Sequence, residues 1–128
     1  MKYRLRKGTG FTLIEMLIVL AIIAVLLTIS LPRYFHSIDV SKEKVLTENL
    51  QVTRDAIDKF YGDLGRYPDS LQELVDKHYL RTLPVDPITG SNSNWEIIAP
   101  DEQFPGKVYD IKSGAPGTTL DGRPYESL

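Results

Sequence analysis

The 128-residue sequence contains no cysteine, which excludes disulfide bonds and thiolate chemistry. Its two histidines, His36 and His78, are far apart and have no second ligand at helical spacing, so a histidine-based metal centre is not expected. It also lacks a Gly-x-Ser-x-Gly nucleophile elbow and a complete phosphate-binding glycine loop. No catalytic constellation is present, and we therefore predict a protein that is not an enzyme.

Acidic residues are absent from the first ten positions, which carry four basic ones: Lys2, Arg4, Arg6 and Lys7. Since the chain has 15 basic and 17 acidic residues, 11 basic residues remain against all 17 acids in the rest. A mildly acidic body argues against nucleic acid as a partner. A basic start before an apolar run predicts that the N-terminus lies on the cytoplasmic side of a membrane.

Charge is nearly absent from residues 11–31, where Glu15 is the single charged residue. As a helix this run would be roughly 31 Å long, enough to cross a hydrocarbon core of about 30 Å. A secretory signal peptide is an alternative, but the run is too long and no A-x-A-like site follows it. A plain signal anchor is another, but it leaves Glu15 unexplained. A carboxylate at the bilayer centre costs about 2.5–3.5 kcal/mol, and less near the edge.

The segment Gly10-Phe11-Thr12-Leu13-Ile14-Glu15 resembles the class III signal of type IV pilins and type II secretion pseudopilins. The resemblance implies that a membrane-embedded prepilin peptidase cleaves between Gly10 and Phe11, that Phe11 is N-methylated, and that the apolar helix is retained. It also implies that Glu15 pairs with the N-terminal amine of a neighbouring subunit, where a pair is tolerated better than a lone buried charge. A snorkelling acid near a helix end is the alternative.

One long helix is predicted from about Phe11 to Tyr61, apolar in its first half and amphipathic in its second. Pro32 should kink or interrupt it, because proline cannot donate the i→i−4 hydrogen bond. In filaments of the resembling family the helix often loosens before this proline, which implies the same for Ala24–Pro32. The charged residues of the second half form a solvated face, or they bridge subunits through Lys44, Glu48 and Arg54.

Gly62 and Gly65 should end this helix, and five further segments are predicted beyond them. Ser70 and Glu73 form a capping-box pattern, which predicts a short helix over about Ser70–His78. Residues Tyr79–Gly90 read as a turn-rich loop. The predicted strands are Asn94–Ala99 and Lys107–Lys112, and Ser113–Leu128 reads as loop, with a short third strand left open.

The middle of the chain is similar to major, G-type pseudopilins in two motifs, Tyr61-x-Asp63-x-Gly65-x-Tyr67-Pro68 and Leu83-Pro84-x-Asp86-Pro87. With the N-terminal signal, this similarity covers most of the chain up to Gly90. It departs at Ile88, where that group commonly has tryptophan. The resemblance implies an α+β, pilin-like fold, with a leader over residues 1–10, a transmembrane and filament-core helix over 11–31, and a periplasmic globular domain over 32–128.

G-type pseudopilins often bind calcium in an aspartate-rich C-terminal loop. Calcium prefers six to eight oxygen ligands, but residues 113–122 offer a single carboxylate, Asp121. Asp110, Ser113 and Asp121 are therefore only weak calcium candidates. We expect a metal-free turn around Asp121-Gly122 and no cofactor.

The resemblance implies a structural subunit that polymerises into the periplasmic pseudopilus of a type II secretion system. Its partners would be other copies of itself, minor pseudopilins or pilins, the prepilin peptidase and an inner-membrane assembly platform. It would cross the inner membrane once, with a cytoplasmic N-terminus and a periplasmic C-terminal domain. The alternatives are a major or minor type IV pilin of a surface pilus, a membrane-anchored periplasmic enzyme, and a module that captures secretion substrates at a filament tip.

Overall fold

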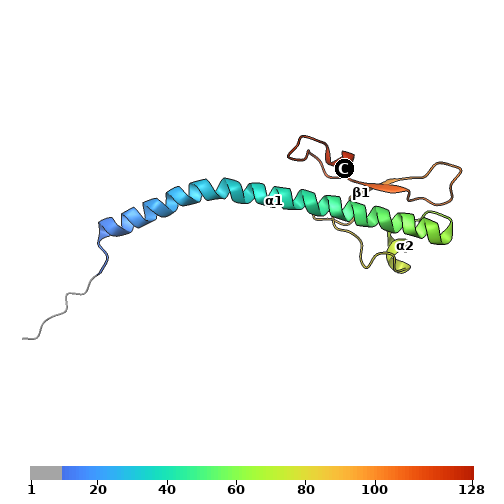
Figure 1. Ribbon diagram of the computed structural model, residues 1–128, viewed down its shortest axis with the longest axis horizontal. Coiled ribbons are helices and arrows are strands. Elements are labelled where there is room, and N and C mark those ends of the chain that lie inside the picture. Colours follow the sequence, from blue (N-terminus) through green and yellow to red (C-terminus); the bar gives the residue numbers. More distant parts are fainter. Residues whose placement is uncertain (1–9) are drawn as a thin grey trace, which may run out of the picture. The chain divides into compact units, whose positions relative to one another are not determined.

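The computed structural model describes residues 10–128. In chain order its elements are helix α1 (Leu13–Leu64), helix α2 (Leu71–Asp76), strands β1 (Trp95–Ile98) and β2 (Asp110–Ser113), and a 3-10 helix over Tyr125–Ser127 (Figure 1). The chain divides into two compact units, Met1–Ser37 and Ile38–Leu128, so the boundary falls inside α1. The α+β fold with one long N-terminal helix and a small antiparallel sheet is confirmed.

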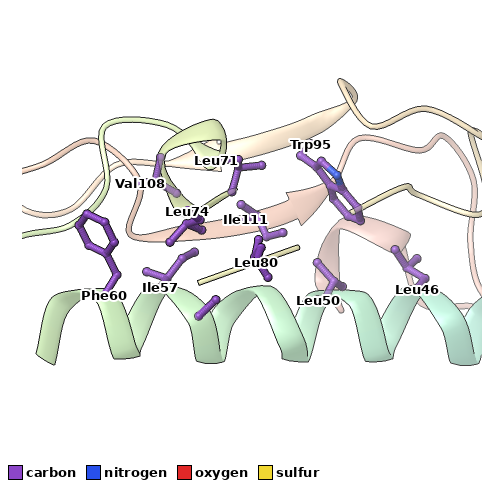
Figure 2. Packing of buried hydrophobic residues seen from close by; sticks show 11 residues of the cluster. Leu46, Leu50, Ile57, Phe60, Leu71, Leu74, Leu80, Trp95, Val108 and Ile111 are labelled. Carbon is purple, nitrogen blue, oxygen red and sulfur yellow. The ribbon is translucent and has the colours of Figure 1, made fainter. Parts of the chain in front are cut away.

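The core of the second unit forms where one face of α1 packs under α2 and the two strands. Apolar residues on α1 recur every three or four positions, which places them on one face of the helix. Figure 2 shows these side chains pointing from the helix toward Trp95, Val108 and Ile111. Full burial of such a side chain contributes about 1.5–3 kcal/mol. The helix contributes Leu46, Leu50, Ala56, Ile57 and Phe60, and α2 contributes Leu71 and Leu74.

Helix α2 begins as the capping-box pattern predicts, because the Ser70 hydroxyl accepts a hydrogen bond from the Glu73 amide at 3.2 Å. It is shorter than predicted and ends at Asp76, two residues before His78. His78 has φ 65°, a left-handed conformation that stops the helix. The Glu73 carboxylate accepts a hydrogen bond from Arg66 at 2.7 Å, which ties the segment before α2 to its first turn.

The sheet has two antiparallel strands, with Trp95 opposite Ser113 and Ile98 opposite Asp110. Strand β2 starts three residues later than the predicted Lys107 because the Lys107 and Val108 amides donate instead to the Pro68 carbonyl. In residues 113–128 no third strand forms: the structure has an isolated bridge between Thr118 and Pro124 and then the 3-10 helix.

A buried carboxylate organises the loop between α2 and β1. Asp86 is fully buried, and its carboxylate accepts hydrogen bonds from the Ile88 amide at 2.8 Å and from the Ser113 hydroxyl on β2. The neighbouring Val85 carbonyl accepts from Asn49 of α1, also at 2.8 Å. The predicted turn-rich loop is thus fixed to both the helix and the sheet, because a buried carboxylate must be fully hydrogen-bonded.

In the first unit, α1 continues through Pro32 without interruption. Of the two predicted effects of Pro32, an interruption of the helix is therefore wrong for the single chain, and a kink stays a prediction. The missing proline N–H removes one backbone hydrogen bond, but the helical bonds on either side preserve the helix. The Thr28 hydroxyl donates to the Ala24 carbonyl at 2.8 Å, so this polar group is satisfied within the helix. Loosening of residues 24–32 in a filament stays a prediction.

Candidate assembly segment

The start of α1 is fixed by Thr12. The Thr12 hydroxyl accepts a hydrogen bond from the Glu15 amide at 3.2 Å, and the Thr12 carbonyl accepts one from Met16 at 3.1 Å. Glu15 therefore lies in the first turn, where a negative charge interacts favourably with the helix dipole. This role of Thr12 was not predicted from the sequence. The Thr-x-x-Glu spacing, a capping-box pattern, was the signal that could have revealed it.

The Glu15 side chain is exposed on an otherwise uncharged stretch of helix. Its carboxylate makes no hydrogen bond or ion pair with any of residues 10–128. A carboxylate in an apolar environment requires a cation or several donors. The fold thus leaves Glu15 able to accept a partner from another molecule.

Gly10 precedes α1 in exposed, non-helical backbone. A Cβ atom added there would meet no other atom within 4 Å, and the residue does not have a positive φ. Neither space nor backbone conformation therefore requires glycine at position 10. A glycine at position 10 is instead explained by an interaction with another molecule, such as recognition by a processing enzyme.

The apolar residues that follow Glu15 are also exposed, and an 18-residue window of α1 is apolar enough to cross a membrane with none of it buried. Leu17 keeps 58% of its surface exposed and Leu20 also 58%, whereas Leu50 of the same helix keeps 1%. A contiguous apolar surface of this kind marks a membrane or protein contact. Its members include Ile14, Met16, Ile18, Val19, Ile22, Ile23, Val25, Leu26, Leu27, Ile29 and Leu31.

The charged residues proposed to bridge subunits differ in their surroundings. The Arg54 guanidinium binds within its own chain, to the Asp110 carboxylate at 2.8 Å and to the Ile111 carbonyl at 3.0 Å. Arg54 thus secures β2 to α1, and its bridging role is not supported. Lys44 and Glu48 line an open groove of about 500 Å³ along α1. Bridging through these two residues stays a prediction.

Two of the three weak calcium candidates are engaged by other side chains, and the expected absence of calcium stays a prediction. Asp110 binds Arg54, and the Ser113 hydroxyl donates to the buried Asp86. Asp110 and Ser113 are three positions apart on β2 and so lie on opposite faces of the strand. Asp121 is exposed, and residues 10–128 contain no group of three side chains able to hold a metal. The donor set does not fit the six to eight oxygens that calcium requires.

The C-terminal loop is instead secured by hydrogen bonds that the sequence analysis did not foresee. The Glu43 carboxylate of α1 accepts from the Leu120 amide. Within the loop, the Thr119 amide donates to the Arg123 carbonyl at 2.7 Å, and the buried Thr119 hydroxyl accepts from the Arg123 amide at 3.2 Å. No spacing in the sequence connects Glu43 with a loop more than 70 residues away, so only the fold reveals this contact.

Comparison with known proteins supports the significance of the N-terminal segment. Residues 5–31 match the family described as the prokaryotic N-terminal methylation motif. Type II secretion system core protein G of Pseudomonas aeruginosa is 29% identical over 88% of this chain and 87% of its own length. Competence protein ComGC of Halalkalibacterium halodurans is 31% identical over 62% of this chain and 78% of its own length.

A further relative is similar over a shorter stretch. Type IV major pilin protein PilA of Myxococcus xanthus is 35% identical over 53% of this chain but only 31% of its own length. No solved structure matches the chain. The similarity to core protein G thus extends over nearly the whole chain, whereas the similarity to the major pilin covers about half of it.

Proposed function

Because this chain belongs to the type IV pilin-like family, which includes the type II secretion pseudopilins, we propose that it is a structural subunit of a type II secretion pseudopilus. The observation that carries this proposal is the full-length similarity to core protein G, together with an exposed apolar helix that has one acid in its first turn. The chain acts by assembly and not by catalysis.

Assembly follows from what the first unit leaves exposed. In the bilayer, lipid covers the apolar surface of residues 11–31, and in a filament the same surface packs against helices of other copies. Cleavage after Gly10 frees a cationic amine at Phe11. That amine neutralises Glu15 of a neighbouring copy, and a shifted register would leave both charges unpaired in an apolar environment. The charge pair therefore specifies register more than it adds strength.

The membrane topology and the partners follow from the same proposal. The basic residues before the apolar run hold the N-terminus in the cytoplasm, and the single span places the second unit in the periplasm. Processing at Gly10 requires a prepilin peptidase on the cytoplasmic side. Extraction of the helix from the bilayer requires an inner-membrane assembly platform, and the filament includes other copies and minor pseudopilins.

Mass spectrometry of the mature protein tests the processing step. In a strain with an active prepilin peptidase, we expect the chain to begin at N-methylated Phe11. The unprocessed precursor should accumulate when Gly10 is replaced by Val, because the fold does not need glycine there but the peptidase does. A wild-type chain that keeps its first ten residues in that strain would contradict the assignment.

Crosslinking tests whether Glu15 pairs with the amine of a neighbouring copy. Because the chain has no native cysteine, a disulfide can form only at an introduced cysteine. A single cysteine in place of Leu17, in a chain that keeps Glu15, should give disulfide-linked dimers under oxidising conditions. Glu15→Ala should insert into the membrane normally but lose these dimers. Thr12→Ala is the matched control, because it removes the cap of α1 and keeps the carboxylate. Equal loss in both variants would mean that Glu15 acts through the helix start and not through a charge pair.

A type IV pilin of a surface pilus is the second candidate, favoured by the similarity of about half of the chain to PilA. Deletion of the gene distinguishes the two functions. Loss of exoprotein secretion with surface filaments retained supports the pseudopilin. Loss of surface filaments while secretion continues would replace it with the pilin.

A further inference from the structure

Four aromatic rings gather where α1 ends in the second unit. Tyr61, in the last turn of α1, stacks on Tyr67 with ring centres 4.5 Å apart. Tyr67 meets Tyr109 edge to face at 5.3 Å and Phe104 at 6.4 Å, with interplanar angles of 81° in both pairs. The Phe104 and Tyr109 rings therefore stand nearly perpendicular to the Tyr67 ring. The three rings can thus form the sides of a small pocket.

These walls enclose a pocket of about 360 Å³, within the size range of ligand sites. Its lining consists of Tyr67, Ile98, Ala99, Asp101, Phe104 and Tyr109. Phe104 is 39% exposed and Tyr109 is 52% exposed. The pocket is thus open to solvent, which suits the end of a long side chain tethered to a partner better than an enclosed small molecule.

The backbone around the pocket is fixed by hydrogen bonds. The Tyr67 amide donates to the Pro105 carbonyl at 2.9 Å, and the Tyr109 amide donates to the Ile98 carbonyl at 2.8 Å. Gly106 has φ 112°, and a Cβ atom there would lie 2.3 Å from the Tyr67 carbonyl oxygen. The loop therefore approaches Tyr67 as closely as only glycine permits, and the walls are preorganised.

A tight turn brings a negative charge to the pocket. The Phe104 amide donates to the Asp101 carbonyl at 2.9 Å, so residues 101–104 form a β-turn whose two ends both line the pocket. Burial raises the pKa of the Tyr67 hydroxyl, and Tyr109, Tyr61 and Asp58 raise it further. The raised pKa keeps the Tyr67 hydroxyl neutral, and the negative charge that favours a cation in this pocket is that of Asp101.

Within the part of the chain that the structure describes, no basic side chain lines this pocket, whose six lining residues include no lysine or arginine. The neighbouring Arg66 lies 5.1 Å over the Phe60 ring and binds Glu73, so it is already engaged. A cation that fills the pocket must therefore come from another molecule.

We propose that this aromatic pocket is a docking site for a basic side chain, arginine before lysine, on a protein partner. The guanidinium stacks on the face of one of these rings, contacts the others at their edges, and forms an ion pair with Asp101. This surface is separate from the assembly segment, and the proposal does not depend on the function proposed above.

Nuclear magnetic resonance on the full chain in detergent micelles tests the proposal, with arginine amide as the probe and citrulline amide as its neutral counterpart. Arginine amide should shift the ring resonances of Tyr67, Phe104 and Tyr109 in a saturable way, and citrulline amide should not. Phe104→Leu and Asp101→Asn should each raise the dissociation constant about two- to fivefold, as expected for a cation–π contact or ion pair at an exposed site.

Two substitutions outside the pocket lining serve as controls. Glu102→Gln removes an adjacent exposed acid that does not line the pocket, and Phe35→Leu removes an exposed ring in the first unit. Both should leave the dissociation constant unchanged. Equal binding of arginine and citrulline amides, equal weakening by Glu102→Gln and Asp101→Asn, or binding of tetramethylammonium alone would each overturn the proposal.

Discussion

The two units of this chain use similar apolar residues in opposite ways. Leu50 in the second unit is 1% exposed, whereas Leu20 in the first is 58% exposed, although both belong to α1. From residue 38 onward, charged residues separate the apolar ones and leave one face to bury. From residue 13 to residue 31, apolar residues surround the helix, so no single face can be covered by its own chain. The first unit depends on its surroundings, and the second carries its own core.

Replacing one core residue should change the free energy of unfolding more than any other substitution considered below. It also tests most directly whether the two units differ in stability. Ile57→Ala should lower the free energy of unfolding of the second unit by about 2–5 kcal/mol, because Ile57 is fully buried. Leu20→Ala should change it little. Denaturant titration in detergent micelles, followed by the fluorescence of Trp95, measures both, since Trp95 is the single tryptophan and lies in the core. Equal losses would mean that the units are not energetically distinct.

A smaller loss is expected when the buried carboxylate of the second unit is removed. Asp86→Ala leaves the Ile88 amide and the Ser113 hydroxyl without their acceptor, which should cost about 3 kcal/mol. Asp58→Ala, at an exposed position of α1, is the matched control and should cost little. If both variants unfold at the same denaturant concentration, the Asp86 hydrogen bonds do not stabilise the loop.

The ion pair near α2 should give a weak, pH-dependent effect. The hydrogen bond from Arg66 holds the pKa of Glu73 below its ordinary value of 4.5. A lowered pKa stabilises the fold above 4.5, and this stability is lost as the pH falls through the folded-state pKa. Glu73→Gln should therefore cost up to about 1 kcal/mol at pH 7, because the pair is partly exposed.

The same measurement at low pH provides the check. The difference between wild type and Glu73→Gln should shrink as the pH falls below 4.5. A difference that stays constant down to pH 2 would show that the substitution acts through packing and not through charge.

Metal removal should have the smallest effect. Hydrogen bonds from Glu43 and within residues 119–123 hold the C-terminal loop, so we propose that it needs no calcium. A chelator should leave the melting temperature nearly unchanged, whereas Glu43→Ala should lower it by a few degrees, consistent with about 1 kcal/mol in a domain of this size. A large drop on chelation would establish a calcium-stabilised loop.

Local patterns predicted the elements better than their ends. The long helix, the Ser70 cap and two antiparallel strands are all readable in the sequence because each rests on periodicity or on residues a few positions apart. Strand β2 was misplaced because Pro68, distant in sequence, takes the amides of Lys107 and Val108. The predicted end of α2 was wrong because His78 adopts a left-handed conformation, which few non-glycine residues adopt.

The candidate site was predictable for a related reason. Gly10, Phe11 and Glu15 lie within six consecutive positions, so the sequence alone places them close together. Thr12 was missed although its spacing to Glu15 was visible. The hydrogen bonds between Arg54 and Asp110 and between Glu43 and Leu120 join positions more than 50 residues apart. No local sequence pattern could therefore predict them.

The sequence by itself determined the long apolar helix, its lone acid and the match to the N-terminal methylation motif, because these depend on composition and on spacing along one segment. Only the tertiary structure decided which charges remain available to other molecules and where the aromatic rings converge. Arg54, Glu43 and Asp86 are engaged by distant groups, and the pocket at Tyr67 exists because Gly106 lets a remote loop approach. Those outcomes depend on long-range packing, which brings together residues that the chain order keeps apart.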